Sequence, residues 1–77
     1  MFSKGLTQLH EGKYKEALEV FTTMLKKNPI DIAALHNHGK AALKLNDTKT
    51  ACEDWNAIKD LNKEYADDLL KEYCSGK

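Results

Sequence analysis

The chain has 77 residues, which is enough for one small domain. Its 12 basic and 12 acidic side chains cancel, and the lack of a basic excess argues against a nucleic-acid or membrane-surface partner. Hydrophobic residues make up 42%, a share typical of a globular chain, and no apolar run approaches the roughly 20 residues of a membrane span. The first residues do not resemble a signal peptide, so we expect a cytoplasmic protein, with the periplasm as the alternative if the chain is a fragment.

The first half of the chain predicts two helices. Apolar side chains at spacings of three and four run from Phe2 to Leu9 and again from Tyr14 to Leu25. Gly12 separates the two stripes, because glycine can adopt the left-handed backbone that ends a helix. The second helix should close at Asn28, because the residue before Pro29 is pushed out of the helical conformation.

The second half predicts three more helices. Asp31 can cap a third helix, whose apolar stripe runs from Leu35 to Leu43. Asn46 suits the next turn, since asparagine tolerates a positive φ better than most residues. A fourth stripe runs from Ala51 to Leu61, and a fifth helix is expected over about Glu64–Cys74. We therefore expect an all-α chain of five helices.

The pattern repeats after 34 residues. Small and bulky apolar residues recur in the same order, pairing Gly5 with Gly39, Ala17 with Ala51, Phe21 with Trp55 and Met24 with Ile58. A glycine in the first helix, an Ala-x-x-x-aromatic segment in the second and the closing Pro29 resemble the tetratricopeptide repeat family. The C-terminal segment also resembles the ends of small bacterial members of that family.

This resemblance implies the architecture. It is a short right-handed superhelix of two antiparallel helix-turn-helix units, residues 1–31 and 32–65, with a capping helix and tail over residues 66–77. We also expect the small residues to face one another at close helix crossings, Gly5 against Ala17 and Gly39 against Ala51. Leu69, Leu70 and Tyr73 would then cover apolar surface left open by the fourth helix.

The residues that carry chemistry are few. His36 and His38 are two positions apart, so on a helix they point to different sides rather than toward one metal ion. The sequence has no Cys-x-x-Cys pair, no His-Glu-x-x-His segment and no glycine-rich phosphate loop. We therefore expect that the protein is not an enzyme and that it has no catalytic, metal-binding or cofactor-binding residues.

The two cysteines allow two interpretations. Cys52 lies on the apolar side of the fourth stripe and Cys74 ends the expected cap. Both can be buried free thiols that pack as small hydrophobic residues, and the missing signal peptide favours this interpretation. A Cys52–Cys74 disulfide that ties the cap to the repeats is the alternative, which requires an oxidising compartment.

A candidate groove follows from the resemblance, since the first helices of successive repeats line a concave surface in that family. The residues expected on it are Phe2, Leu6, His10, His36, Asn37, Lys40, Lys44 and Lys71. A groove with an apolar end and a basic end would suit a protein or peptide partner with acidic and apolar residues. If the ligand is acidic, it should bind more tightly at a pH below the His36 pKa, near 6.5, where the imidazole is positively charged. In the alternative interpretation, the apolar members are core and the lysines only solvated.

The predicted function is therefore non-catalytic binding of a partner's peptide or helix. The alternative is a structural module for self-association or assembly docking, including a homodimer. Lys4, Gln8 and Glu11 put polar groups at the N-terminal edge, which disfavours this alternative.

Overall fold

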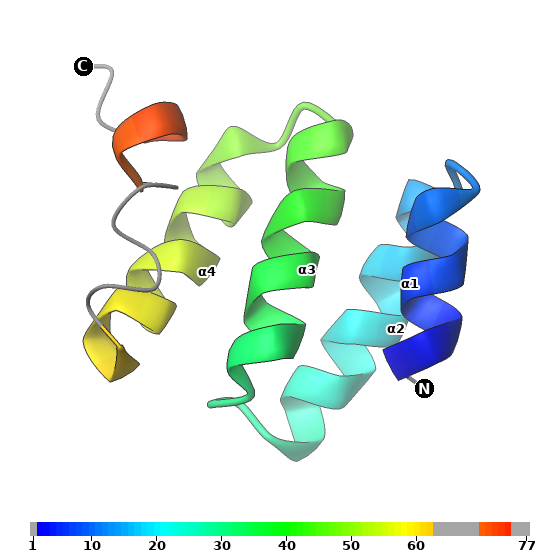
Figure 1. Ribbon diagram of the computed structural model, residues 1–77, viewed down its shortest axis with the longest axis horizontal. Helices are drawn as coiled ribbons and strands as arrows, with labels where there is room; N and C mark the ends of the chain where they lie inside the picture. The colour runs from blue at the N-terminus through cyan, green and yellow to red at the C-terminus, as the bar shows by residue number, and fades with distance from the viewer. Residues whose placement is uncertain (1, 63–69, 75–77) are drawn as a thin grey trace.

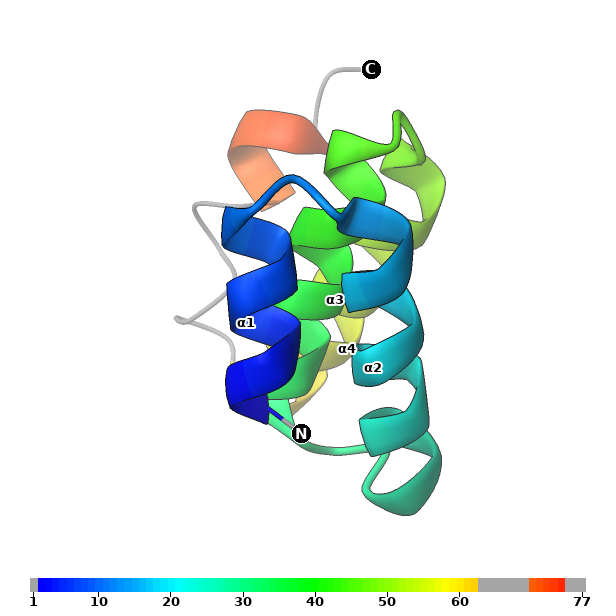
Figure 2. The same cartoon turned by 90° about the vertical axis from the view of Figure 1, so that its right-hand side faces the viewer.

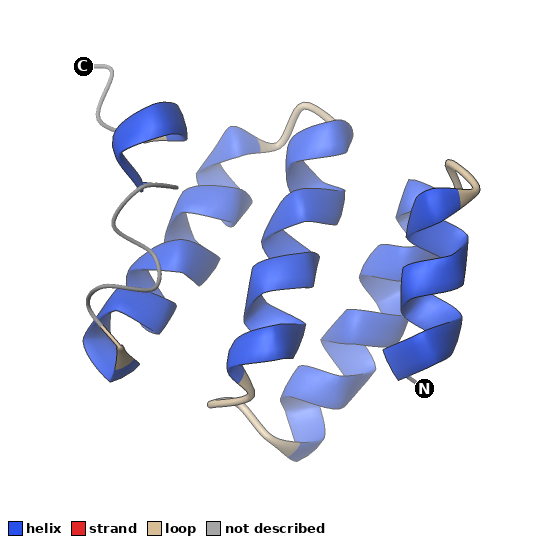
Figure 3. Ribbon diagram, viewed as in Figure 1, coloured by secondary structure: helices blue, strands red, loops and turns tan. Residues whose placement is uncertain are grey.

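The computed structural model describes residues 2–62 and 70–74, and this part of the chain consists of helices and turns without a strand (Figures 1 and 3). The four complete helices are α1 (Phe2–His10), α2 (Tyr14–Lys27), α3 (Ile32–Lys44) and α4 (Thr48–Leu61). Residues 70–73 form a helical turn, which together with residue 74 we call the C-terminal turn. The all-α prediction is confirmed, whereas residues 64–69 of the expected fifth helix lie outside the described residues.

The helices are arranged in two layers. Each packs against the next along the chain, and α1 also touches α3. In Figure 1, α1 and α3 lie toward the viewer and α2 lies behind them. The view turned by 90° places α1 and the C-terminal turn on one side of the molecule and α2 on the other (Figure 2). The odd-numbered helices and the C-terminal turn therefore share one face.

Two turns depend on left-handed backbone, as predicted. Gly12 has a φ of 85° between α1 and α2, and Asn46 has a φ of 65° between α3 and α4. Glycine and asparagine are the residues that adopt this conformation at least cost. The chain therefore reverses direction at these positions for local reasons.

The helices of the second half begin at aspartate caps. The Asp31 carboxylate accepts from the Ala34 backbone N–H at 3.2 Å, which confirms the predicted cap of α3. Asp47 does the same for α4 through the Thr50 backbone N–H at 3.2 Å, and it also accepts from the Thr50 hydroxyl. The residue before α2 is Lys13, which provides no side-chain cap.

Both helix pairs approach closely where a glycine meets an aromatic ring. A Cβ on Gly5 would lie 2.7 Å from Cζ of Phe21, and one on Gly39 would lie 2.6 Å from Nε1 of Trp55. The atoms nearest to the two glycines therefore belong to these rings and not to the expected partners, Ala17 and Ala51, although both alanines are fully buried. The glycines make room for the rings, which need more space than a second small residue would.

The core has two parts, one for each helix pair. The larger cluster consists of Leu35, Ala51, Trp55 and Ile58, and the smaller one of Ala17, Phe21 and Ala41. Phe21 and Trp55 have no exposed surface, so both aromatic side chains belong to the core. Within the described ranges, no helix has both the length and the apolar character needed to cross a membrane.

Candidate binding face

The face shared by α1, α3 and the C-terminal turn carries two hollows. The α1–α3 hollow has a volume of about 390 Å³ and is lined by Leu6, Leu9, His10, Tyr14, Asn37, Lys40 and Lys44. The α3–C-terminal hollow has a volume of about 660 Å³ and is lined by His36, Lys40, Leu43, Lys44, Asn46, Trp55 and Tyr73. Helix α3 thus stands between two depressions of mixed polar and apolar lining.

The two hollows share Lys40 and Lys44. Residues four apart on a helix lie on the same face, so His36, Lys40 and Lys44 form one stripe along α3. Both lysines are exposed and line both hollows. They form a basic ridge on a chain whose formal net charge is zero.

His36 adds little positive charge to this ridge near neutral pH. Its side chain is half-buried, and this burial, followed by the positive charge of Lys40, lowers the pKa of His36 below 6.5. The pH dependence of ligand binding that was expected near the ordinary His36 pKa of 6.5 should therefore occur at a lower pH. The positive charge of the ridge near pH 7 comes from Lys40 and Lys44.

The α3–C-terminal hollow has aromatic walls. Trp55 is fully buried, and its indole N–H donates to the backbone carbonyl of His36 at 3.4 Å. The ring of Tyr73 lies 5.4 Å from that of Trp55, centre to centre, and Tyr73 is 39% exposed. Tyr73 therefore covers the indole and offers part of its own ring to a ligand.

The structure brings most of the predicted groove residues together. Those that line the hollows are Leu6, His10, His36, Asn37, Lys40 and Lys44. Lys71 is exposed on the C-terminal turn and lines neither hollow, and the side chain of Phe2 lies outside the described part of the chain. The hollows are also lined by residues that the sequence pattern did not indicate, namely Leu9, Tyr14, Leu43, Asn46, Trp55 and Tyr73. Apolar spacing had placed most of these in the core or cap, and it cannot show that a core residue also borders a hollow.

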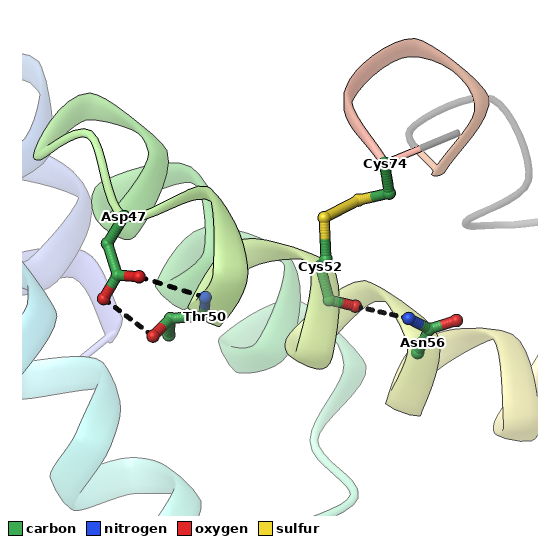
Figure 4. The surroundings of a disulfide bond; sticks show 5 residues. All are labelled: Asp47, Thr50, Cys52, Asn56 and Cys74. Atoms are coloured by element: carbon green, nitrogen blue, oxygen red, sulfur yellow. Dashed lines mark hydrogen bonds between the residues drawn. A yellow bond between two sulfur atoms is a disulfide. The ribbon is translucent and has the colours of Figure 1, made fainter. Parts of the chain in front are cut away.

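The cysteines are joined. Cys52 of α4 and Cys74 of the C-terminal turn form a disulfide, with their Cα atoms 5.8 Å apart (Figure 4). The favoured prediction of two free thiols was therefore wrong, and the alternative is confirmed. The pairing depends on how the chain end returns to α4, which spacing along the sequence does not reveal.

A polar cluster links three helices on the other side of α3. His38 contacts the Asp54 carboxylate through Nδ1, and its Nε2 lies 3.0 Å from the hydroxyl of Thr22. The connectivity is that of an acid–imidazole–hydroxyl triad, but Thr22 also donates to the Leu18 carbonyl of its own helix and lines neither hollow. We interpret the cluster as a crosslink of α2, α3 and α4. Thr22 and Asp54 each lie 16 residues from His38 along the chain, so the packing of the helices, and no local pattern, brings them together.

His36 and His38 lie on different sides of α3, as expected. His36 lines the α3–C-terminal hollow, whereas His38 is held by Asp54 and Thr22. Among residues 2–62 and 70–74, no three histidine, cysteine, aspartate or glutamate side chains gather as a metal site would require.

Comparisons with known proteins add no relative. The chain matches no family model, no curated protein and no solved structure.

Proposed function

We propose that the chain is a non-catalytic interaction module, built from two tetratricopeptide-like units and a capping segment, that binds a peptide of a partner protein. The repeated pairing of a glycine with a buried aromatic supports the repeat, because Gly5–Phe21 and Gly39–Trp55 are related by the same shift of 34 residues. The placement of α1 and the C-terminal turn on one side of the molecule (Figure 2), with α3 toward the same face in Figure 1, supports a binding face there.

The observation that carries the proposal is the basic ridge between two partly apolar hollows. Lys40 and Lys44 would attract acidic groups of the ligand. The hollows on either side would take apolar side chains, against Leu6 and Leu9 in one and Tyr73 in the other. The preferred ligand is therefore a peptide that combines acidic and apolar residues.

The disulfide changes the expected compartment. Disulfides persist in oxidising compartments and are rare in the cytoplasm. The cytoplasmic expectation had favoured free thiols at Cys52 and Cys74, which the structure joins. We therefore propose that the chain works in an oxidising compartment, such as the periplasm named above as the alternative.

The ridge can be tested by reversing its charge. The probe is a short fluorescent peptide in which glutamate alternates with leucine or phenylalanine. Each exposed charge contact is worth up to about 1 kcal/mol, so Lys40→Glu with Lys44→Glu should weaken binding about tenfold or more. Added salt should weaken binding to the unmodified chain, because it screens these charges. Fluorescence anisotropy measures the affinity, and circular dichroism should show unchanged helicity because both lysines are exposed.

A matched control makes the same change of charge elsewhere. Lys15 and Lys49 are exposed in the first turns of α2 and α4, where negative charge is favourable, and neither lines the two hollows. Lys15→Glu with Lys49→Glu should bind the peptide within about twofold of the unmodified chain. Equal affinity of all three proteins would remove the site from this face. A failure to bind, together with dimers in light scattering, would favour self-association instead.

A further inference from the structure

The C-terminal turn is tied to the repeats by a covalent bond. The disulfide joins Cys52, in the first half of α4, to Cys74 across a sequence separation of 22 residues (Figure 4). Residues 70–73 of this turn are helical, and among the described contacts the disulfide is its one covalent link to α4.

The same turn forms one wall of the α3–C-terminal hollow. Tyr73 lines the hollow opposite the stripe of α3 and covers Trp55, while Leu70 and Cys74 pack against the core cluster around Trp55. By contrast, the lining of the α1–α3 hollow includes no residue of the C-terminal turn. One hollow therefore requires the turn in place, and the other does not.

We infer that the disulfide controls ligand binding: only the oxidised chain has a complete α3–C-terminal hollow, and reduction opens it. This inference rests on the proposed function, since it names a control on the same site. In the reduced chain, the covalent link is lost, and the apolar contacts of Leu70, Tyr73 and Cys74 oppose the conformational freedom of the chain end without it. The turn then leaves Trp55, and a ligand loses the Tyr73 wall while it keeps Lys40 and Lys44.

The redox step is an ordinary thiol–disulfide exchange. On formation, the thiols of Cys52 and Cys74 lose two protons and two electrons to a disulfide-bearing oxidant, whose own sulfur–sulfur bond breaks to give a dithiol. A dithiol reductant reverses the step. Because coupling between two equilibria is reciprocal, a bound peptide should make the disulfide correspondingly harder to reduce.

The first measurement needs no ligand. Trp55 is the only tryptophan of the chain, so its fluorescence reports the state of the turn. A small dithiol should increase quenching of Trp55 by an added soluble quencher, and Cys52→Ser with Cys74→Ser should show the same increase without reductant. Unchanged Trp55 quenching in both would overturn the inference, whatever the peptide does.

The second measurement uses the alternating glutamate–leucine/phenylalanine peptide of the preceding test. Reduction should weaken its binding about tenfold or more, and Tyr73→Ala with the disulfide intact should weaken it similarly. Equal affinity of the oxidised and reduced chains, with Trp55 exposed on reduction, would overturn the control by the disulfide and leave the proposed function standing. If even the oxidised chain fails to bind the peptide, the proposed function is contradicted, and so is the control of binding by the disulfide. In that case, the quenching of Trp55 fluorescence still shows whether the disulfide holds the turn in place.

Discussion

The two helix pairs have the same arrangement of apolar core residues but differ in the polar and covalent interactions that stabilise them. In α1–α2 and in α3–α4, a glycine accommodates a fully buried aromatic ring and an alanine four residues before that ring is buried. Only the second pair adds aspartate caps at both helices and a disulfide at α4. The repeated residues therefore set how the helices approach, and the non-repeated residues add stability to the second pair.

Among the proposed changes, removal of the disulfide should have the largest effect on stability. A crosslink between residues 22 apart restricts the unfolded chain, so Cys52→Ser with Cys74→Ser should lower the free energy of unfolding by about 3 kcal/mol. Urea unfolding followed by circular dichroism measures the loss, and the reduced unmodified chain should unfold at the same urea concentration as the variant. Equal stability of the oxidised chain and the variant would mean that the crosslink does not distinguish the two pairs.

The paired glycines come next. Gly39→Ala would place a Cβ 2.6 Å from the indole of Trp55, which is held by its hydrogen bond to His36 and by the ring of Tyr73. Overpacking of this kind costs about 1–3 kcal/mol, partly offset by a helix-propensity gain of about 1 kcal/mol.

Gly5→Ala is the matched variant in the first pair, with the same propensity gain. The obstructing atom is the tip of the Phe21 ring, which can shift at lower cost, so this variant should lose less stability than Gly39→Ala. Thermal unfolding of the two proteins side by side measures the difference. A larger loss for Gly5→Ala would show that the first pair is the more tightly packed.

The helix caps should give the smallest effect. Asp31→Ala removes the hydrogen bond to the Ala34 backbone N–H and should destabilise the protein by about 1 kcal/mol. Lys13→Ser would supply the first pair with a side-chain cap for α2 and should act in the opposite direction, by about 1 kcal/mol or less. If Lys13→Ser lowers the melting temperature, the backbone at that position does not suit a cap.

Much of the fold could be predicted because its signals are local. The stop at Gly12, the turn at Asn46 and the cap at Asp31 each depend on residues within about one helical turn. The stripe of Lys40 and Lys44 was predictable for the same reason, since helical spacing alone places them on one face.

The rest depended on how helices meet. The sequence by itself determined the helices, their ends, the 34-residue repeat and the basic stripe of α3, because backbone geometry fixes these over a few residues. Tertiary structure decided that Gly39 faces Trp55, that Cys52 meets Cys74 and that His38 lies between Thr22 and Asp54. It also decided that Tyr73 closes one side of a hollow. These contacts join residues 16 or more positions apart, so they depend on how the helices are placed relative to one another. The side-chain pattern of a single helix does not specify that placement.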